Sequence, residues 1–197
     1  MAVPASSRPA LYRVNQFFLA LKATLPAWAG GGPRHLTREQ QTNLATILPT
    51  PAQQALFQRM SLNDQRHALA VLHTLQQHDH HQPALGQAAL LHDVAKSLGQ
   101  PLIHRVLIVL FEAFWPSALP WLSRLEAGQA VESIAWWRRP FVIHAEHPAL
   151  GAEWAAGADC LPLAVRLIAR HQDKQDKQDN LEENQLLAVL QWADNLN

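Results

Sequence analysis

The stretch AALLHDVAKSLG, residues 88–99, places a histidine and an aspartate side by side within an apolar run. Alanine, leucine and valine surround His92 and Asp93, so we expect both side chains to face protein rather than water. Burying an ionisable group without a partner is costly. Two explanations are open: the pair is satisfied within the core, or a bound cation compensates for its burial. Lys96 follows one helical turn later, where its ammonium group would compete with a metal ion unless an anion such as phosphate lay between them.

The composition is that of a globular chain. Of the 197 residues, 48% are hydrophobic and 16% are charged, which suffices for one domain with a real core. The 16 Lys and Arg residues balance 16 Asp and Glu residues, so nothing favours sequence-specific or general nucleic-acid binding. The single cysteine, Cys160, excludes a disulfide within the chain and argues against a thiolate metal site. Both features suit a reducing compartment, and we predict a cytoplasmic location.

The pattern of apolar residues predicts an all-α protein. Leu, Ala and Gln dominate, and no stretch alternates with period two for long. Capping residues and prolines mark the boundaries between helices. We expect helices over 9–25, 37–48, 61–77, 83–98, from 101 onward, and over 118–126, 129–137, 145–157, 161–172 and 181–195. Residues 1–58 are assigned to an N-terminal helical extension packed on the core, and 59–197 to the main domain.

The segment RVLIVLFEAFWPSALPWL, residues 105–122, is strongly apolar. It contains Glu112 and two prolines, and it is too short to span a bilayer. We expect a buried helical hairpin or the face of a homodimer there, with a peripheral membrane contact as the remaining alternative. No transmembrane segment is predicted.

Further ionisable residues lie on the apolar faces of other predicted helices. Each of them, taken alone, is explained as a polar residue satisfied within or beside the core. Together with His92 and Asp93 they supply four histidines and two carboxylates, a nitrogen and oxygen set that suits Fe, Mn, Zn, Co, Ni or Mg. The additional residues are His67, His147, His171 and Asp194.

The order of these residues resembles the HD superfamily of metal-dependent phosphohydrolases over about residues 60–197. The segments HPALGA (147–152) and RHQD (170–173) are similar to the extra histidine segments of its binuclear branches, such as the HD-GYP phosphodiesterases and the HD-type diadenosine-tetraphosphate hydrolases. Gln172 stands where the HD-GYP proteins carry a second histidine, and no GYP follows. Cleavage of cyclic di-GMP is therefore disfavoured.

The resemblance implies an HD-domain helical bundle that holds one or two divalent ions. It implies that the first ion is held by His67, His92, Asp93 and Asp194. Asp93 would bridge to a second ion, which His147 and His171 would also hold. Lys96 corresponds to the phosphate-contacting lysine of the family pattern HDxxK.

The implied activity is hydrolysis of a phosphate ester or phosphoanhydride, in a nucleotide or a related small phosphorylated metabolite, by metal-activated water. Asp93 and Lys96 would carry the catalytic roles. The alternative is a non-catalytic HD-type module that binds a nucleotide and regulates a partner. The two functions require the same metal ligands, but only the enzyme would turn over a substrate.

Three other residues are candidates for substrate binding. Arg138 and Arg139 lie in WWRRPF, residues 136–141, where guanidinium groups beside aromatic faces suit phosphate or base contacts. The alternative, which their position favours, is an amphipathic helix end with exposed arginines. His144 lies three residues before His147, where it could support that residue or face the substrate.

Overall fold

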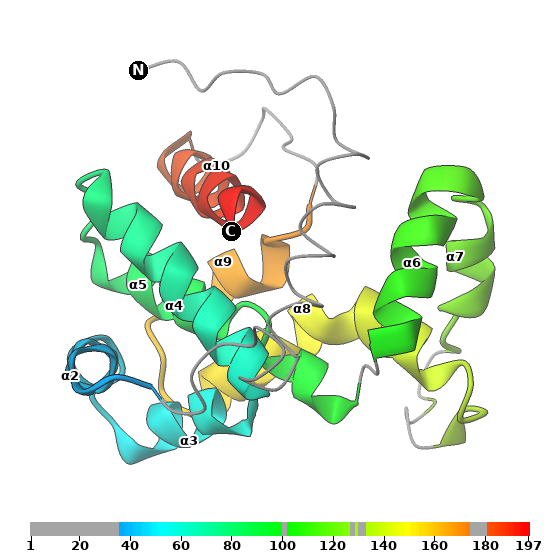
Figure 1. Ribbon diagram of the computed structural model, residues 1–197, viewed down its shortest axis with the longest axis horizontal. Coiled ribbons are helices and arrows are strands. Elements are labelled where there is room, and N and C mark those ends of the chain that lie inside the picture. Colours follow the sequence, from blue (N-terminus) through cyan, green and yellow to red (C-terminus); the bar gives the residue numbers. More distant parts are fainter. Residues whose placement is uncertain (1–35, 100–101, 127–128, 130–132, 174–180) are drawn as a thin grey trace, which may run out of the picture. The chain divides into compact units, whose positions relative to one another are not determined.

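The computed structural model describes residues 36–99, 102–126, 129, 133–173 and 181–197 (Figure 1). The described residues form helices joined by turns and loops and contain no strand, which confirms the predicted all-α class. Two compact units contain them: residues 36–99 with 143–197, here called the bundle unit, and residues 102–142, here called the hairpin unit. The helix predicted over 9–25 lies outside the described residues, and the domain boundary after residue 58 stays a prediction.

The bundle unit is organised around one helix that is buried on every side. Each residue of this helix, α5, after its first proline is buried, and its sequence PALGQAALL has no polar face. Helices α4 and α9 pack on α5, and α10 packs on all three. The bundle comprises α2 (Arg38–Ile47), α3 (Pro51–Arg59), α4 (Leu62–Gln77), α5 (Pro83–Leu91), the 3-10 helix η2 (Val94–Leu98), most of α8 (Arg139–Gly157), α9 (Pro162–Arg170) and α10 (Leu181–Leu196).

Side-chain caps fix the beginnings of the early helices. The helix starts predicted near residues 37 and 61 are confirmed, and α2 begins with a reciprocal capping box between Thr37 and Gln40. Helix α3 was not predicted. Thr50 and Gln53 form a second capping box, and Pro51 occupies the first turn. The segment TPAQ thus contained the same signal as the TREQ segment at the start of α2.

The helix predicted over 83–98 is interrupted at its centre, so that prediction was wrong in one respect. Helix α5 ends at Leu91, and η2 begins at Val94. His92 and Asp93 occupy the junction, where Asp93 has a φ of −103° and a ψ of 8°. These angles belong to the sparsely populated bridge region in which many active-site residues lie. In a continuous helix the two side chains would diverge by about 100°. The junction releases them from that constraint.

A glycine brings α8 close to the junction. A Cβ atom at Gly151 would lie 3.4 Å from Val94 in η2 and 3.4 Å from Ile168 in α9. A side chain larger than a methyl group would therefore push α8 away from both elements. His147 lies one turn before Gly151 on the same helix, so this close approach brings its imidazole toward the bundle centre.

Charged and amide side chains fix α10 against α9. Glu183 accepts hydrogen bonds from Arg166 at 2.8 Å and from Arg170 at 3.0 Å. These hydrogen bonds, that of Arg166 foremost, lower the pKa of Glu183. Farther along α10, the Gln191 amide donates to the carbonyl oxygens of His171 and Asp173. The end of α9 is thereby held beside α10.

The hairpin unit contains α6 (Leu102–Phe114) and α7 (Ala118–Leu122), which pack against each other as the expected hairpin. The prediction that this hairpin is buried was wrong, because Phe114, Trp115 and Trp121 are exposed. Its small apolar cluster includes Ile108, Leu122 and Phe141. The residues that follow differ from prediction. The helix expected over 118–126 ends at Leu122, and described residues 133–138 form turns where a helix over 129–137 was expected. Helix α8 begins at Arg139 rather than near 145.

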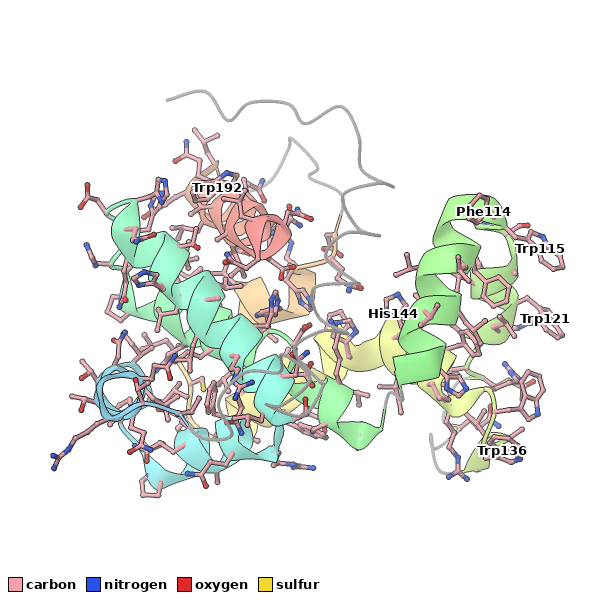
Figure 2. The ribbon with its side chains drawn as sticks, in the orientation of Figure 1. Phe114, Trp115, Trp121, Trp136, His144 and Trp192 are labelled. Carbon is pink, nitrogen blue, oxygen red and sulfur yellow. The ribbon has the colours of Figure 1, made fainter. Side chains whose placement is uncertain are left out.

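Large aromatic side chains extend outward from the hairpin unit (Figure 2). Phe114 is 83% exposed and Trp136 is 76% exposed, and Trp115 and Trp121 are also exposed. Among the described helices, none is both long enough and apolar enough to cross a membrane. The homodimer face and the peripheral membrane contact considered for residues 105–122 stay predictions.

Candidate metal centre

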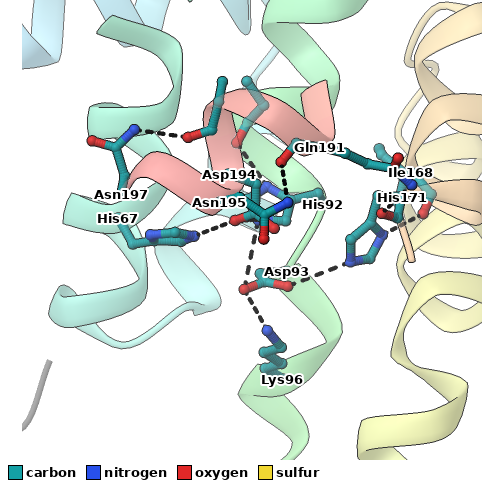
Figure 3. Close-up of polar contacts among 12 residues, drawn as sticks. His67, His92, Asp93, Lys96, Ile168, His171, Gln191, Asp194, Asn195 and Asn197 are labelled. Atoms are coloured by element: carbon teal, nitrogen blue, oxygen red, sulfur yellow. Dashed lines mark hydrogen bonds and ion pairs between the residues drawn. The ribbon is translucent and has the colours of Figure 1, made fainter. Parts of the chain in front are cut away.

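Six ionisable side chains from five parts of the bundle unit converge at one place, and Figure 3 shows five of them, all except His147. They come from the middle of α4, the junction after α5, α8, the residue after α9, and the end of α10. The ligand atoms of five of these residues form two groups that share Asp93, and within each group the atoms lie within 4.8 Å of one another. The first group is His67, His92 and Asp93, and the second is Asp93, His147 and His171.

Asp194 completes the first group. Its Oδ1 atom lies 2.8 Å from Nε2 of His67 and 3.4 Å from Nε2 of His92. The same Nε2 atom of His92 lies 3.6 Å from Oδ2 of Asp93. Two imidazoles and two carboxylates therefore surround one position, although His67 and Asp194 are separated by 127 positions in the sequence.

The second group lies deeper in the protein. The Nε2 atoms of His147 and His171 are 3.2 Å apart. Oδ1 of Asp93 lies 3.4 Å from the first of these atoms and 3.7 Å from the second. All three side chains are buried, so nitrogen and oxygen donors meet here with little access for bulk water.

Backbone carbonyls fix the orientation of three of the imidazoles. In each of them Nδ1 lies within hydrogen-bond distance of the carbonyl oxygen three residues earlier. Because a carbonyl only accepts, these contacts assign the proton to Nδ1 and leave a lone pair on Nε2 of the neutral ring. Such contacts typically orient metal-binding histidines. The pairs are His92 with Ala89 at 3.0 Å, His147 with His144 at 2.7 Å, and His171 with Ile168 at 2.7 Å.

The two carboxylates are strongly acidic. Burial by itself would raise their pKa values, but neighbouring positive groups reverse this. Lys96 and His92 hold the pKa of Asp93 well below its ordinary value, and His92 and His67 do the same for Asp194. Both groups are therefore ionised at neutral pH, as metal ligands must be.

The buried histidines differ in proton affinity. Burial opposes protonation of His92, but the carboxylates of Asp93 and Asp194 raise its pKa to about 9. Burial lowers the pKa of His147 to about 4, despite its contact with Asp93. Without a metal, His92 is therefore a doubly protonated imidazolium at neutral pH and must lose its Nε2 proton to bind a metal ion. The ring of His147 is neutral at the same pH.

Among the described residues, two polar atoms in the centre have no hydrogen-bond partner and make only ion-pair contacts of 3.4 to 3.7 Å. They are Nε2 of His92 and Oδ1 of Asp93, both buried. Buried polar atoms are rarely left unsatisfied, because each costs its full desolvation free energy. One atom belongs to the first group and the other faces the second. The residues present therefore fit divalent cations bound through nitrogen and oxygen.

The structure places Lys96 directly on the shared carboxylate. Its Nζ atom lies 2.6 Å from Oδ2 of Asp93, on the side away from the second group's contacts with Oδ1 (Figure 3). The ammonium group thus lies beside the centre, as the spacing suggested. It contacts the aspartate rather than standing apart from it.

The remaining candidate residues have other contacts. Arg138 donates to the carbonyl oxygens of Leu122 and Arg124, and Arg139 donates to that of Ile134. Both guanidinium groups thus organise backbone within the hairpin unit.

His144 is half-buried, and its ring stacks on His147 with centroids 5.9 Å apart. Substrate binding by His144, Arg138 or Arg139 stays a prediction. Sequence reasoning missed Gln191, whose amide holds the backbone at His171. No motif distinguishes it from the other glutamines on helices.

No protein-family model, curated protein or solved structure shows a significant match to the chain. The interpretation of the centre therefore rests on the geometry and chemistry of its own residues.

Proposed function

We propose that the protein is a metal-dependent phosphohydrolase of the HD type. Its substrate would be a phosphate ester or phosphoanhydride of a nucleotide or a related small metabolite. The observation that carries the proposal is the pair of Nε2 atoms of His147 and His171, 3.2 Å apart beside the Asp93 carboxylate.

This pair favours a cation because of where its protons lie. The contacts of both rings with carbonyl oxygens place their protons on Nδ1. At neutral pH the low pKa of His147 keeps its ring neutral, so its Nε2 presents a lone pair toward His171. Two imidazoles held so that their Nε2 atoms converge next to a carboxylate are a ready-made site for a divalent ion.

The donor set supports one or two ions, from among Fe, Mn, Zn, Co, Ni and Mg. The first group with Asp194 would hold one ion, and the second group would hold another, with Asp93 common to both. Bound there, divalent ions would supply activation of water for attack on phosphorus and charge neutralisation on phosphate oxygens.

The side chains suggest how a substrate approaches. The side chains of His67 and Asp194 are 26% and 34% exposed, and that of Lys96 is 20% exposed, whereas His147 is fully buried. A phosphate would therefore arrive on the side of the first group. Lys96 could exchange its contact with Asp93 for one with a phosphoryl oxygen, and so stabilise the charge that develops there.

Asp93 would act as a ligand and as the group that holds Lys96 in place before the substrate binds. Arg138, Arg139 and His144 remain proposed substrate contacts. A cytoplasmic location remains our proposal, on the ground that the one cysteine argues against an oxidising environment.

The ion pair of Lys96 with Asp93 favours a second candidate, a non-catalytic nucleotide-binding module. An ammonium group 2.6 Å from the shared carboxylate partly replaces the charge of a metal ion. A regulatory module could bind phosphate through Lys96 without turnover. Enzymatic turnover distinguishes the two candidates.

The decisive experiment is a screen of the purified protein against phosphorylated metabolites with added Mn²⁺, Mg²⁺, Co²⁺, Ni²⁺ or Fe²⁺. His67→Ala is compared with His73→Ala, because His73 is an exposed histidine on the same helix. We expect release of phosphate that EDTA abolishes. His67→Ala should lower it by at least about 100-fold, because the loss of a direct ligand should cost no less than the loss of a group that orients one, and His73→Ala should leave it unchanged. Equal turnover in the two variants, or turnover that survives EDTA, would contradict the proposal.

A further inference from the structure

A proline interrupts the helix that carries His147. Pro148 lies inside α8, which runs from Arg139 to Gly157. Proline has no backbone N–H, and its ring displaces the carbonyl four residues earlier. That carbonyl belongs to His144, and it accepts the Nδ1 proton of His147 at 2.7 Å. The carbonyl oxygen of His144 therefore receives no hydrogen bond from the backbone at position 148 and instead accepts one from the side chain of His147.

The other two anchored imidazoles use carbonyls in the last turn of a helix. His92 bonds to Ala89 at the end of α5, and His171 bonds to Ile168 at the end of α9, where the carbonyl also accepts the backbone N–H of His171 at 3.5 Å. The last four carbonyls of a helix lack the backbone donor four residues later that carbonyls in the helix interior have. His147 lies ten residues before the end of α8, where an uninterrupted helix would occupy its carbonyls.

We propose that Pro148 is a positioning residue for the metal centre. By removing one backbone donor it frees the His144 carbonyl to hold the Nδ1 proton of His147. Nε2 is then unprotonated and points toward Asp93 and His171. The consequence for metal binding rests on the proposed function, but the position of the proton is a property of the metal-free protein.

The test compares four chains of full length. They are the wild type, Pro148→Ala, a chain with lactic acid in place of Pro148, and Pro162→Ala. Alanine restores the N–H at position 148, whereas lactic acid provides the same side chain on an ester that lacks it. Pro162 occupies the first turn of α9, where a backbone N–H has no helical acceptor, so it is a matched proline control.

Two measurements are made on each chain. Nitrogen-15 NMR of labelled histidine reports which ring nitrogen of His147 carries the proton in EDTA, and calorimetry reports binding of Mn²⁺ alone. We expect the Nδ1–H form in the wild type, the lactic acid chain and Pro162→Ala. In Pro148→Ala we expect a mixture of both tautomers, and affinity for the second Mn²⁺ lowered by about 10- to 100-fold.

An unchanged tautomer in Pro148→Ala would overturn the proposal, and so would a lactic acid chain that behaves like Pro148→Ala. If Pro148→Ala does not fold, the lactic acid chain decides, because Nδ1–H in that chain supports the proposal and Nε2–H contradicts it. Failure of the wild type to bind Mn²⁺ would refute the proposed function while leaving the tautomer comparison to decide the role of Pro148.

Discussion

The ammonium group of Lys96 and the carboxylate of Asp93 form an ion pair of 2.6 Å, and they do so on the one carboxylate that both candidate metal groups share. The other oxygen of Asp93 faces His147 and His171. Lys96 therefore compensates part of the negative charge in the absence of a metal, and it repels any cation that binds nearby. The same residue is placed to contact a phosphate.

Replacing Lys96 with methionine should separate these two effects. Methionine keeps the apolar stem of the side chain and removes the charge. We expect Lys96→Met to bind Mn²⁺ more tightly than the wild type, because a competing cation is gone, and to hydrolyse substrate more slowly, because the phosphate loses its contact. Calorimetry and phosphate release measure the two effects. A variant with weaker Mn²⁺ binding and unchanged turnover would contradict this role.

The sharing of Asp93 leads to a prediction about stoichiometry. Asp93→Asn should weaken the binding of both ions, because both groups lose an anionic ligand. His171→Ala should weaken the binding of the second ion only, since the Nε2 atom of His171 belongs to the second group. Elemental analysis after dialysis against Mn²⁺ should give fewer ions in Asp93→Asn than in His171→Ala. Equal metal content in the two variants would argue against a bridging carboxylate.

The metal-free protein should be most stable near pH 6.5. The pKa of His92 is raised to about 9, so its contribution to the free energy of unfolding is complete below pH 6.5 and lost as the pH rises to 9. The pKa of His147 is lowered to about 4, so between pH 6.5 and 4 this histidine is protonated in the unfolded chain but not in the folded one. The free energy of unfolding therefore falls as the pH drops through this range. The lowered pKa values of Asp93 and Asp194 add a further loss in acid, below their ordinary value of 3.8.

Saturating Mn²⁺ should abolish the alkaline loss of stability in this profile. A metal binds the neutral imidazole of His92, so Mn²⁺ binding should strengthen as the pH rises from 6.5 to 9 and offset the loss seen in the metal-free protein. Urea unfolding in EDTA and in Mn²⁺ over pH 4 to 9 measures the free energy of unfolding on the acid and the alkaline side of pH 6.5. Parallel curves in the two buffers would show that the imidazole of His92 does not bind the ion.

Cys160 should be inert in the native protein. Burial, together with the neighbouring Asp159, raises the pKa of its thiol to about 11, so little thiolate is present at pH 8. A disulfide reagent should therefore react slowly with the folded chain and rapidly in denaturant. Fast reaction in buffer would show that the end of α8 opens readily, and the same assay verifies the folding of each variant described above.

The sequence predicted those parts of the protein that depend on local signals. Thr37 and Ser61 mark helix starts because a side-chain oxygen must accept an N–H there. The six ionisable residues on the apolar faces of helices could be predicted to lie together for a similar reason, since buried polar atoms need partners.

Features that depend on tertiary contacts could not be predicted from the pattern. The break at His92 and Asp93 interrupts a run of good helix formers, and the imidazole of His92 contacts the Ala89 carbonyl there. The contact between Gln191 and the His171 carbonyl joins two helices and leaves no trace in either sequence. The interruption of hydrogen bonding at Pro148 was visible in the sequence, but the imidazole that uses it was not.

Diffraction from crystals grown with Mn²⁺ tests the central claim most directly. Data collected near the manganese absorption edge locate the ion by its anomalous signal without reference to the protein chemistry. We predict a peak bounded by His67, His92, Asp93 and Asp194, and a second bounded by Asp93, His147 and His171, each at about 2 to 2.3 Å from its nitrogen and oxygen ligands. A map from well-ordered crystals with no peak at Asp93, and with Lys96 still paired to it, would contradict the claim that these side chains are gathered to bind metal.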